Sequence, residues 1–159
     1  MHKKKVLDVP KIKQLKNHCG PASLAMVFQY YGLNVTQEEV AEYWGNEYVS
    51  QAGVYYFTLV GCARHFGFSA SAKEHFTLEE IIKTVDQGYP IIARVRVEGQ
   101  IPKHLCVIHG YETSPSLLWI NDPDRISKKR ELYDNFCQMW NLRGYGATYK
   151  YGVVVKKKR

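Results

Sequence analysis

The sequence predicts an α+β protein in which helices from the first half of the chain pack on a mostly antiparallel sheet from the second half. Apolar residues recur at helical spacing up to about residue 88, whereas β-branched apolar runs bounded by Gly, Pro, Ser and Asp dominate after residue 90. This segregation of helices and strands is typical of α+β folds. The 159 residues, of which 45% are hydrophobic, suffice for one packed core. We therefore expect a single domain over residues 1–159, with basic tails at 1–5 and 156–159.

The first helix is predicted at residues 20–31, after an extended segment at 6–13 that Pro10 interrupts. Its apolar positions recur at i, i+3, i+4 and i+7: Leu24, Val27, Phe28 and Tyr31. Pro21 suits the first helical turn, and Gly32 can end the helix. The helix therefore begins directly after a cysteine.

Three further helices are predicted before the strands begin. Thr-x-x-Glu capping boxes at 36–39 and 77–80 open the second and the fourth helix, which end near Trp44 and Gly88. The third helix, at 54–67, carries its apolar residues on one face and ends at a glycine. Together these helices supply the layer that is expected to cover the sheet.

Four β-branched, apolar segments form the predicted sheet, and they lie at residues 90–99, 104–112, 117–122 and 147–155. The second and the third of these segments are separated by a short turn that contains Ser and Pro, so we expect them to pair as a hairpin. A short helix at 131–142 is expected to pack Phe136 and Trp140 inward.

The net charge of +7 resides at the two ends of the chain. Residues 1–16 and 150–159 hold half of all Lys and Arg residues but a single acidic residue, so the remaining body is weakly acidic. This distribution argues against a nucleic-acid partner, which requires a basic patch on the folded body. We expect solvated basic tails, with contact to a membrane surface or a polyanion as the alternative.

Four cysteines lie far apart, without a CxxC pair or a Cys/His spacing suited to zinc: Cys19, Cys62, Cys106 and Cys137. A chain of this size does not need disulfides, so we expect free thiols in a reducing, cytoplasmic compartment, with two disulfides as the alternative. No apolar run reaches the length of about 20 residues that a membrane helix needs, and the N-terminus lacks the apolar region of a secretory signal. No metal or organic cofactor is expected.

Cys19 stands where the first predicted helix begins. Unpaired N–H groups and the helix dipole favour an anion there, and so they favour a thiolate over a thiol. Gly20 has no side chain, so a substrate could approach the sulfur closely. A small buried residue without a chemical role is the alternative, and the presence of a base near Cys19 decides between the two.

Among the six histidines, His104 and His109 lie on the predicted strand at 104–112. Pairing with the following strand places His104 across from residues 122–124, where Asp122 is the nearest carboxylate, but places no carboxylate across from His109. The two histidines are an odd number of residues apart and so face opposite sides of the sheet. A carboxylate that accepts from one ring nitrogen fixes the tautomer and stabilises the imidazolium. Cys19, His104 and Asp122 therefore form a candidate nucleophile, base and orienting acid.

Gln14 gains a role from this set. Its side-chain amide, five residues before Cys19, could donate one N–H to a developing oxyanion, with the Cys19 backbone N–H as the second donor. Without the other candidate residues, Gln14 would be an ordinary loop residue.

These residues belong to an ordered set of motifs over roughly residues 7–155: Gln14-x4-Cys19-Gly-Pro-Ala-Ser-Leu, Tyr-Tyr-Gly32, His104-x-Cys-Val-Ile-x-Gly-Tyr111, Trp-Ile-Asn-Asp122-Pro123 and Phe136-x3-Trp140. The set resembles the papain-like cysteine peptidases of the bacteriocin-processing, double-glycine-leader type. The resemblance implies a papain-like fold, a triad of Cys19, His104 and Asp122, and Gln14 in the oxyanion hole. It also implies a peptide or protein substrate, often a leader peptide cut after a Gly-Gly pair, and a domain that is often fused to an ABC transporter.

Two departures from that family stand out. The sequence shows no transporter segment, and His18 occupies the position before the cysteine where Asp, Asn or a similar polar residue is more common. A protonated His18 could favour the thiolate, or His18 could be a plain surface residue.

The predicted activity is that of a cysteine peptidase that hydrolyses peptide bonds through a thioester intermediate. A glutamine deamidase or acyl transferase with the same triad is one alternative, because the triad specifies acyl transfer but not the acceptor. A peptide-binding module without catalysis is the second alternative, and the intact set of Gln14, Cys19, His104 and Asp122 argues against it.

Overall fold

The computed structural model describes residues 1–45, 58–96, 104–141 and 149–158 of the chain. Its helices there are α1 (Cys19–Tyr30), α2 (Gln37–Ala41), α4 (Thr58–His65), α5 (Leu78–Asp86) and α6 (Tyr133–Trp140). Its strands there are β1 (Lys4–Val6), β2 (Phe68–Lys73), β3 (Ile91–Val95), β4 (His104–Thr113), β5 (Ser116–Asn121), β6 (Arg130–Leu132) and β7 (Gly152–Lys157).

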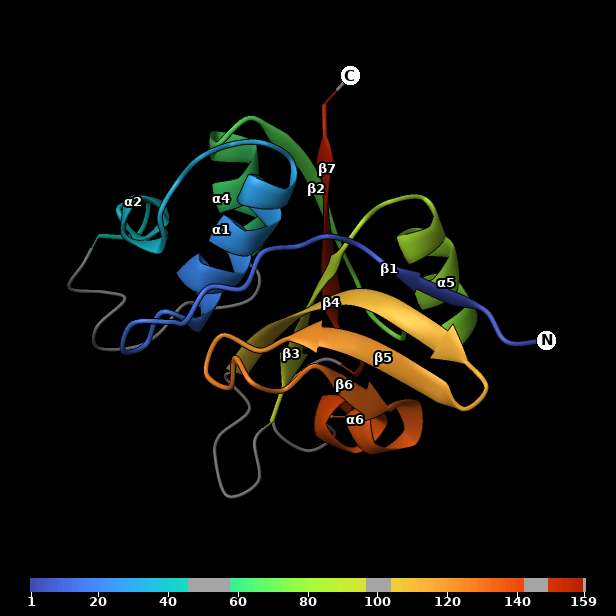
Figure 1. The fold of residues 1–159 in the computed structure, drawn as a ribbon. Coiled ribbons are helices and arrows are strands. Elements are labelled where there is room, and N and C mark those ends of the chain that lie inside the picture. Colours follow the sequence, from blue (N-terminus) through green and yellow to red (C-terminus); the bar gives the residue numbers. More distant parts are fainter. Residues whose placement is uncertain (46–57, 97–103, 142–148, 159) are drawn as a thin grey trace.

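The strands of the described chain form one antiparallel sheet in the order β2-β7-β3-β4-β5-β6, and β1 joins it at β4 (Figure 1). The long strand β4 pairs with three other strands of this sheet. On one side its first half pairs with β3 and its second half with β1, while β5 pairs with it on the other side. The two ends of β4 therefore have different neighbours.

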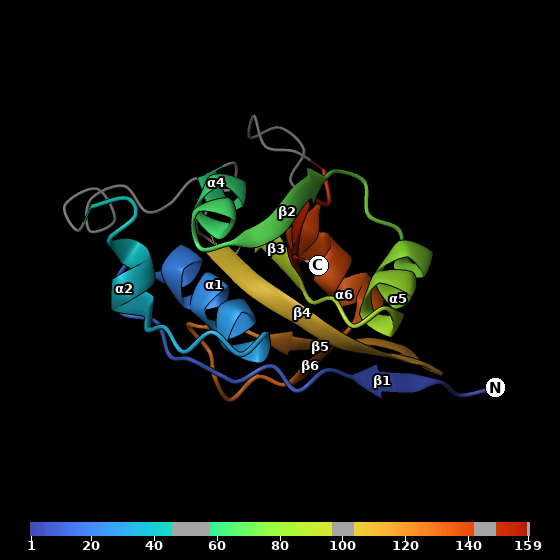
Figure 2. The ribbon, with the colours of Figure 1, turned by 90° about the horizontal axis from the view of Figure 1, so that it is seen from above.

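Helices lie on both sides of the central strands. Figure 1 shows α1 and α5 above β4, and α6 below β5 and β6. Figure 2 shows α2 and α4 beside α1, on the side away from α5. Every residue of α1 from Cys19 to Phe28 is buried, so this helix forms the centre of the helical layer. Within the described residues, no helix combines the length and the apolar character needed to cross a membrane.

The predicted α+β class and the antiparallel sheet are confirmed. The helices predicted at 20–31, 36–44, 77–88 and 131–142 correspond to α1, α2, α5 and α6, and both capping boxes form as predicted. α4 covers the described part of the third predicted helix. Four pieces of predicted elements lie outside the described residues: 54–57, 97–99, 142 and 147–148.

The sequence does not predict β1, β2 and β6, so the sheet draws on the first half of the chain more than expected. β2 reads Phe-Ser-Ala-Ser-Ala-Lys, and only its first and third residues are buried. Small and polar residues have low β-propensity, which is why this strand escapes prediction. It forms because it pairs along its whole length with the apolar strand β7.

The basic ends of the chain take part in the sheet. Lys4 and Lys5, which the sequence assigns to a tail, lie in β1, and Lys156 and Lys157 lie in β7. The side chains of Lys4, Lys5 and Lys157 are exposed. The backbone of these segments therefore pairs while the side chains lie on the surface, where Lys5 Nζ donates to the Asp86 carbonyl oxygen at 3.0 Å and Lys4 Nζ lies over the Trp119 ring.

β4 and β5 pair as the predicted hairpin. Before a bulge, the pairs are Val107 with Asn121 and Ile108 with Ile120. The bulge takes up His109, and pairing resumes between Gly110 and Trp119. A Cβ atom at Gly110 would lie 2.8 Å from the Lys5 carbonyl oxygen and 3.0 Å from the Trp119 Cβ. Glycine at this position therefore allows β1 and β5 to approach β4 closely.

Candidate active site

Cys19 is the first residue of α1. Its residue is 9% exposed, and the first turn of the helix holds no acidic residue. The N–H groups and the dipole of a helix start attract negative charge, and no carboxylate on the first turn of α1 competes for them. The location of Cys19 at the helix start, which the sequence predicts, is confirmed.

His18 precedes the helix as its N-cap but makes no side-chain cap hydrogen bond. Its Nδ1 lies 2.6 Å from the carbonyl oxygen of Lys16, to which it donates. His18 is thus attached to its own loop through Nδ1. The residue is half-buried, and an effect of His18 on Cys19 stays a prediction.

His104 and Asp122 meet at neighbouring strand ends, because His104 opens β4 and Asp122 directly follows β5. Nε2 of His104 donates to Oδ1 of Asp122 at 2.6 Å, and the side chains are 11% and 12% exposed. The same Oδ1 accepts the backbone N–H groups of Asp124 at 2.9 Å and Arg125 at 3.3 Å. The turn after β5 therefore fixes the carboxylate, and the carboxylate orients the imidazole.

His104 also hydrogen-bonds Cys19. Because Nε2 is occupied by Asp122, we assign the contact with the sulfur to Nδ1. Burial opposes protonation of His104, but the hydrogen bonds to Asp122 and Cys19 and the charges of both groups outweigh it and raise the pKa of His104 to about 9. Burial raises the pKa of Asp122, but the contact with His104 outweighs this and leaves it below its usual value. At neutral pH the structure thus favours an imidazolium between a carboxylate and the Cys19 sulfur.

Gln14 lies against the segment that follows Asp122. Its backbone N–H donates to the carbonyl oxygen of Pro123 at 2.8 Å. Its side-chain Nε2 is 3.4 Å from the carbonyl oxygen of Leu15, and its Oε1 is buried without a hydrogen-bond partner among the described residues. The structure brings Cys19, His104 and Asp122 together and places the Gln14 backbone next to Pro123, while the donor role of its side chain stays a prediction.

The four cysteines are free, as expected. Burial raises the pKa of the Cys62 thiol to about 12 and that of Cys106 well above its ordinary value. Both thiols therefore remain protonated at neutral pH, and they behave as small apolar core residues. Cys137 is half-buried on α6.

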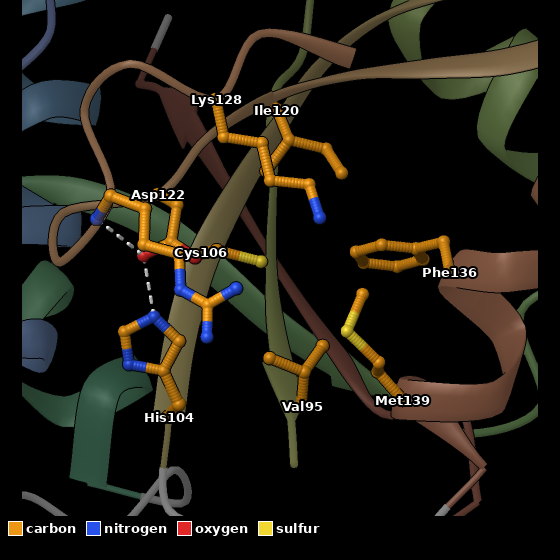
Figure 3. A pocket seen from close by; sticks show the side chains of 9 residues that line it. Val95, His104, Cys106, Ile120, Asp122, Lys128, Phe136 and Met139 are labelled. Carbon is orange, nitrogen blue, oxygen red and sulfur yellow. Dashed lines mark hydrogen bonds and ion pairs between the residues drawn. The ribbon is translucent and has the colours of Figure 1, made fainter. Parts of the chain in front are cut away.

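A cavity of about 200 Å³ adjoins the His104–Asp122 pair. Figure 3 shows the pair on one side of this cavity and Phe136 and Met139 of α6 on the other. The space beside the pair is mainly apolar. The lining residues are Val95, His104, Cys106, Ile120, Asp122, Arg125, Lys128, Phe136 and Met139.

Across the described residues, no group of three or more His, Cys, Asp or Glu side chains gathers as a metal site.

Some residues that support the site are absent from the sequence-based prediction. Asn121 is 2% exposed, and its Nδ2 donates to the carbonyl oxygens of Val9 at 2.9 Å and Pro10 at 3.2 Å. It thereby ties the N-terminal segment to the residue before Asp122. The sequence Asn-Asp-Pro-Asp carries a turn signal that could have suggested the N–H contacts to Asp122, but nothing local indicates the partners of Asn121.

The family model described as "Peptidase_C39 like family" matches residues 6–148. The chain belongs to this family. It is accordingly a cysteine peptidase with a papain-like α+β fold, and the resemblance that the motifs suggest is confirmed. No curated protein matches the sequence.

Solved structures of C39 domains share this fold along nearly the whole chain. The peptidase domain of Streptococcus ComA, a bi-functional ABC transporter involved in a quorum sensing pathway, has a TM-score of 0.73 at 23% identity, covering 92% of this chain and 97% of that one. A double glycine motif protease from an AMS/PCAT transporter, in complex with the leader peptide, has a TM-score of 0.71 at 25% identity, covering 96% and 94%. A protein from Bacillus anthracis named for its likeness to C39 peptidases has a TM-score of 0.75 at 21% identity, covering 99% and 98%.

Proposed function

We propose that the chain hydrolyses peptide bonds with Cys19 as nucleophile, His104 as general acid and base, and Asp122 as orienting acid, and that residues 1–159 form one such domain. The observation that carries the proposal is the 2.6 Å hydrogen bond from His104 Nε2 to Asp122 Oδ1, with His104 also bonded to Cys19. This arrangement leaves one imidazole nitrogen for the sulfur, which is the requirement for activating a thiol.

In the proposed reaction, the Cys19 thiolate attacks the carbonyl carbon of the scissile bond. The Gln14 amide and the Cys19 backbone N–H donate to the oxyanion. The His104 imidazolium protonates the leaving amine, which breaks the C–N bond and leaves a thioester. Neutral His104 then takes a proton from water, the resulting hydroxide attacks the thioester, and release of the acid restores the thiolate and the imidazolium.

The proposed substrate is a leader-type peptide that is cut after a Gly-Gly pair. One similar structure, at 25% identity over 96% of this chain, is a double glycine motif protease in complex with the leader peptide. The free state of all four cysteines favours a reducing, cytoplasmic compartment as the place of action.

The experiment is incubation of the purified chain with a leader-type peptide containing Gly-Gly, followed by mass spectrometry of the products. We expect one cut after Gly-Gly, no product with Cys19→Ala, and strongly reduced cutting when Leu replaces the second Gly of the substrate. Equal cutting at many bulky positions would contradict the Gly-Gly preference. If the peptide stays intact but gains the mass of a Gln-to-Glu conversion, the activity is deamidation and not hydrolysis of peptide bonds.

A further inference from the structure

Gln37, the first residue of α2, hydrogen-bonds the backbone of the residues on both sides of Gln14. Its Nε2 donates to the carbonyl oxygen of Lys13 at 2.7 Å, and its Oε1 accepts the N–H of Leu15 at 2.9 Å. The residue is 7% exposed, so both hydrogen bonds lie where water competes little. One amide thus satisfies two backbone groups that flank a single residue, as a partner in a neighbouring strand would.

The opposite side of the same residue is also held. The backbone N–H of Gln14 donates to the carbonyl oxygen of Pro123 at 2.8 Å, one residue beyond Asp122. The backbone around residue 14 is therefore fixed between Gln37 on one side and the turn after β5 on the other. Lys13 also contacts this turn, since its Nζ donates to the carbonyl oxygen of Asp124 at 2.6 Å. Gln37 thus contributes two of the contacts that set the position of residues 13–15 relative to the turn.

The side chain of Gln14 has little of its own to hold it. Its Nε2 makes one long contact of 3.4 Å with the Leu15 carbonyl oxygen, and its Oε1 lacks a partner among the described residues. A side chain without strong bonds of its own takes its place from the backbone that carries it. The groups that hold the backbone at residues 13–15 thus determine where the amide can donate.

We propose that Gln37 is a positioning residue of the peptidase: it holds the Gln14 amide where the oxyanion develops. This inference rests on the proposed function, in which Gln14 donates to the oxyanion. Gln37 itself bonds to the backbone flanking Gln14 and acts through Gln14. Its loss should therefore lower kcat and leave KM nearly unchanged, because the oxyanion contact strengthens in the transition state.

A matched control exists on α1. Gln29 is also an amide in a helix, it is half-buried, and its Nε2 donates to the carbonyl oxygen of Val35 at 2.9 Å. This bond lies at the far end of α1 from Cys19. Gln29→Met therefore removes a partly buried amide–backbone hydrogen bond without changing the loop that carries Gln14.

The experiment compares Gln37→Met, Gln37→Glu, Gln29→Met, Gln14→Ala and the double variant Gln14→Ala with Gln37→Met, on the peptide substrate described above. For Gln37→Met we expect kcat to fall about 10- to 100-fold, the scale of a small misplacement of a reacting group. For Gln14→Ala we expect a fall of about 10²- to 10³-fold. The double variant should be no slower than Gln14→Ala, because the two residues act as one unit. Gln37→Glu keeps the acceptor for the Leu15 N–H and should fall between the wild type and Gln37→Met.

The rate at which iodoacetamide alkylates Cys19 reports on the thiolate through a reaction that forms no oxyanion. This displacement requires the thiolate but develops no charge on a carbonyl oxygen, so Gln37→Met should leave its rate unchanged. Full activity of Gln37→Met, an equal fall in Gln29→Met, a slowed alkylation, or a further fall in the double variant would each overturn the proposal while leaving the peptidase function intact. Absence of peptide cleavage by the unchanged chain would overturn the proposed function, and this inference with it.

Discussion

Two histidines on β4, five residues apart, occupy opposite electrostatic environments. His104 opens the strand, donates to Asp122 and hydrogen-bonds Cys19, and these contacts raise its pKa to about 9 despite burial. His109 sits in the bulge and is 7% exposed; burial lowers its pKa, and its Nδ1 donates to the carbonyl oxygen of Leu7 at 3.0 Å. At neutral pH one ring is cationic and the other neutral.

The difference shows that the partner across the strand, and not the residue type, decides the role of a histidine. His104 meets a carboxylate at the end of β5, where a positive charge is stabilised. His109 meets a backbone carbonyl, and the Leu7 N–H returns a hydrogen bond to the His109 carbonyl oxygen at 2.7 Å. This reciprocal pair anchors the N-terminal segment to β4. His109 is thus a structural residue, whereas His104 has the surroundings of an acid–base group.

Activity should separate the two histidines most strongly. We expect His104→Ala to lower kcat on the leader-type peptide by about 10⁴-fold or more, because removal of the base also removes the stabilised thiolate. His109→Ala should change kcat far less, since the hydrogen bonds of His109 go to the Leu7 carbonyl oxygen and to Asn121. Comparable losses in both variants, with both proteins folded by circular dichroism, would contradict this separation.

Substitution of Asp122, the carboxylate partner of His104, should have the second-largest effect on kcat. Asp122→Asn retains an oxygen acceptor for the turn but loses the negative charge, so the pKa of His104 should fall. We expect kcat to fall by up to about 10⁴-fold, and by less than in His104→Ala, because the base itself remains. In a pH profile of kcat/KM, the alkaline limb of the wild type should lie near pH 9, where His104 loses its proton, and it should move to lower pH in Asp122→Asn. An unmoved alkaline limb would mean that His104 does not set it.

The smallest effect should be on the free energy of unfolding as a function of pH. The contribution of His104 to this free energy should fall as pH rises, and that of His109 should fall as pH drops. The pKa of folded His104 is raised from 6.5, so its stabilisation is fully present below pH 6.5 and is lost as pH rises through about 9. The pKa of folded His109 is lowered from 6.5, so its contribution is present above pH 6.5 and is lost as pH falls through the folded value.

Urea unfolding at several pH values tests this contrast. Near pH 7, His109→Ala should cost about 0.5–1.5 kcal/mol, because it removes a buried hydrogen bond to the Leu7 carbonyl oxygen, which keeps the Val9 N–H as its donor. The difference between wild type and His109→Ala should shrink on acidification, whereas that between wild type and His104→Ala should shrink on going to pH 9. Parallel curves for the two variants would contradict the opposite charge states.

The sequence predicts most of what is local in this fold. The capping boxes, the helix that starts at Cys19 and the β4–β5 register depend on neighbouring residues, and the register alone suggests Asp122 beside His104. β2 depends on β7, its partner far along the chain, and its own Ser and Ala residues give no signal.

The supports of the site depend on similar distant contacts. Gln37 reads as an ordinary helix residue within a capping box, and only the packing of α2 against residues 13–15 reveals its hydrogen bonds. The cavity beside His104 depends equally on α6 packing over the sheet. The acid–base pair was thus within reach of sequence reasoning, whereas the groups that hold it and the space beside it depend on tertiary structure.

Thiol alkylation against pH, in wild type and His104→Ala, examines the Cys19–His104 pair most directly. Peptide mapping after limited iodoacetamide treatment distinguishes the four cysteines. In the wild type, Cys19 should react faster near neutral pH than Cys62, Cys106 and Cys137, and in His104→Ala it should lose that advantage. A Cys19 that stays inert in both proteins, or that reacts equally fast in both, would contradict a thiolate held by His104.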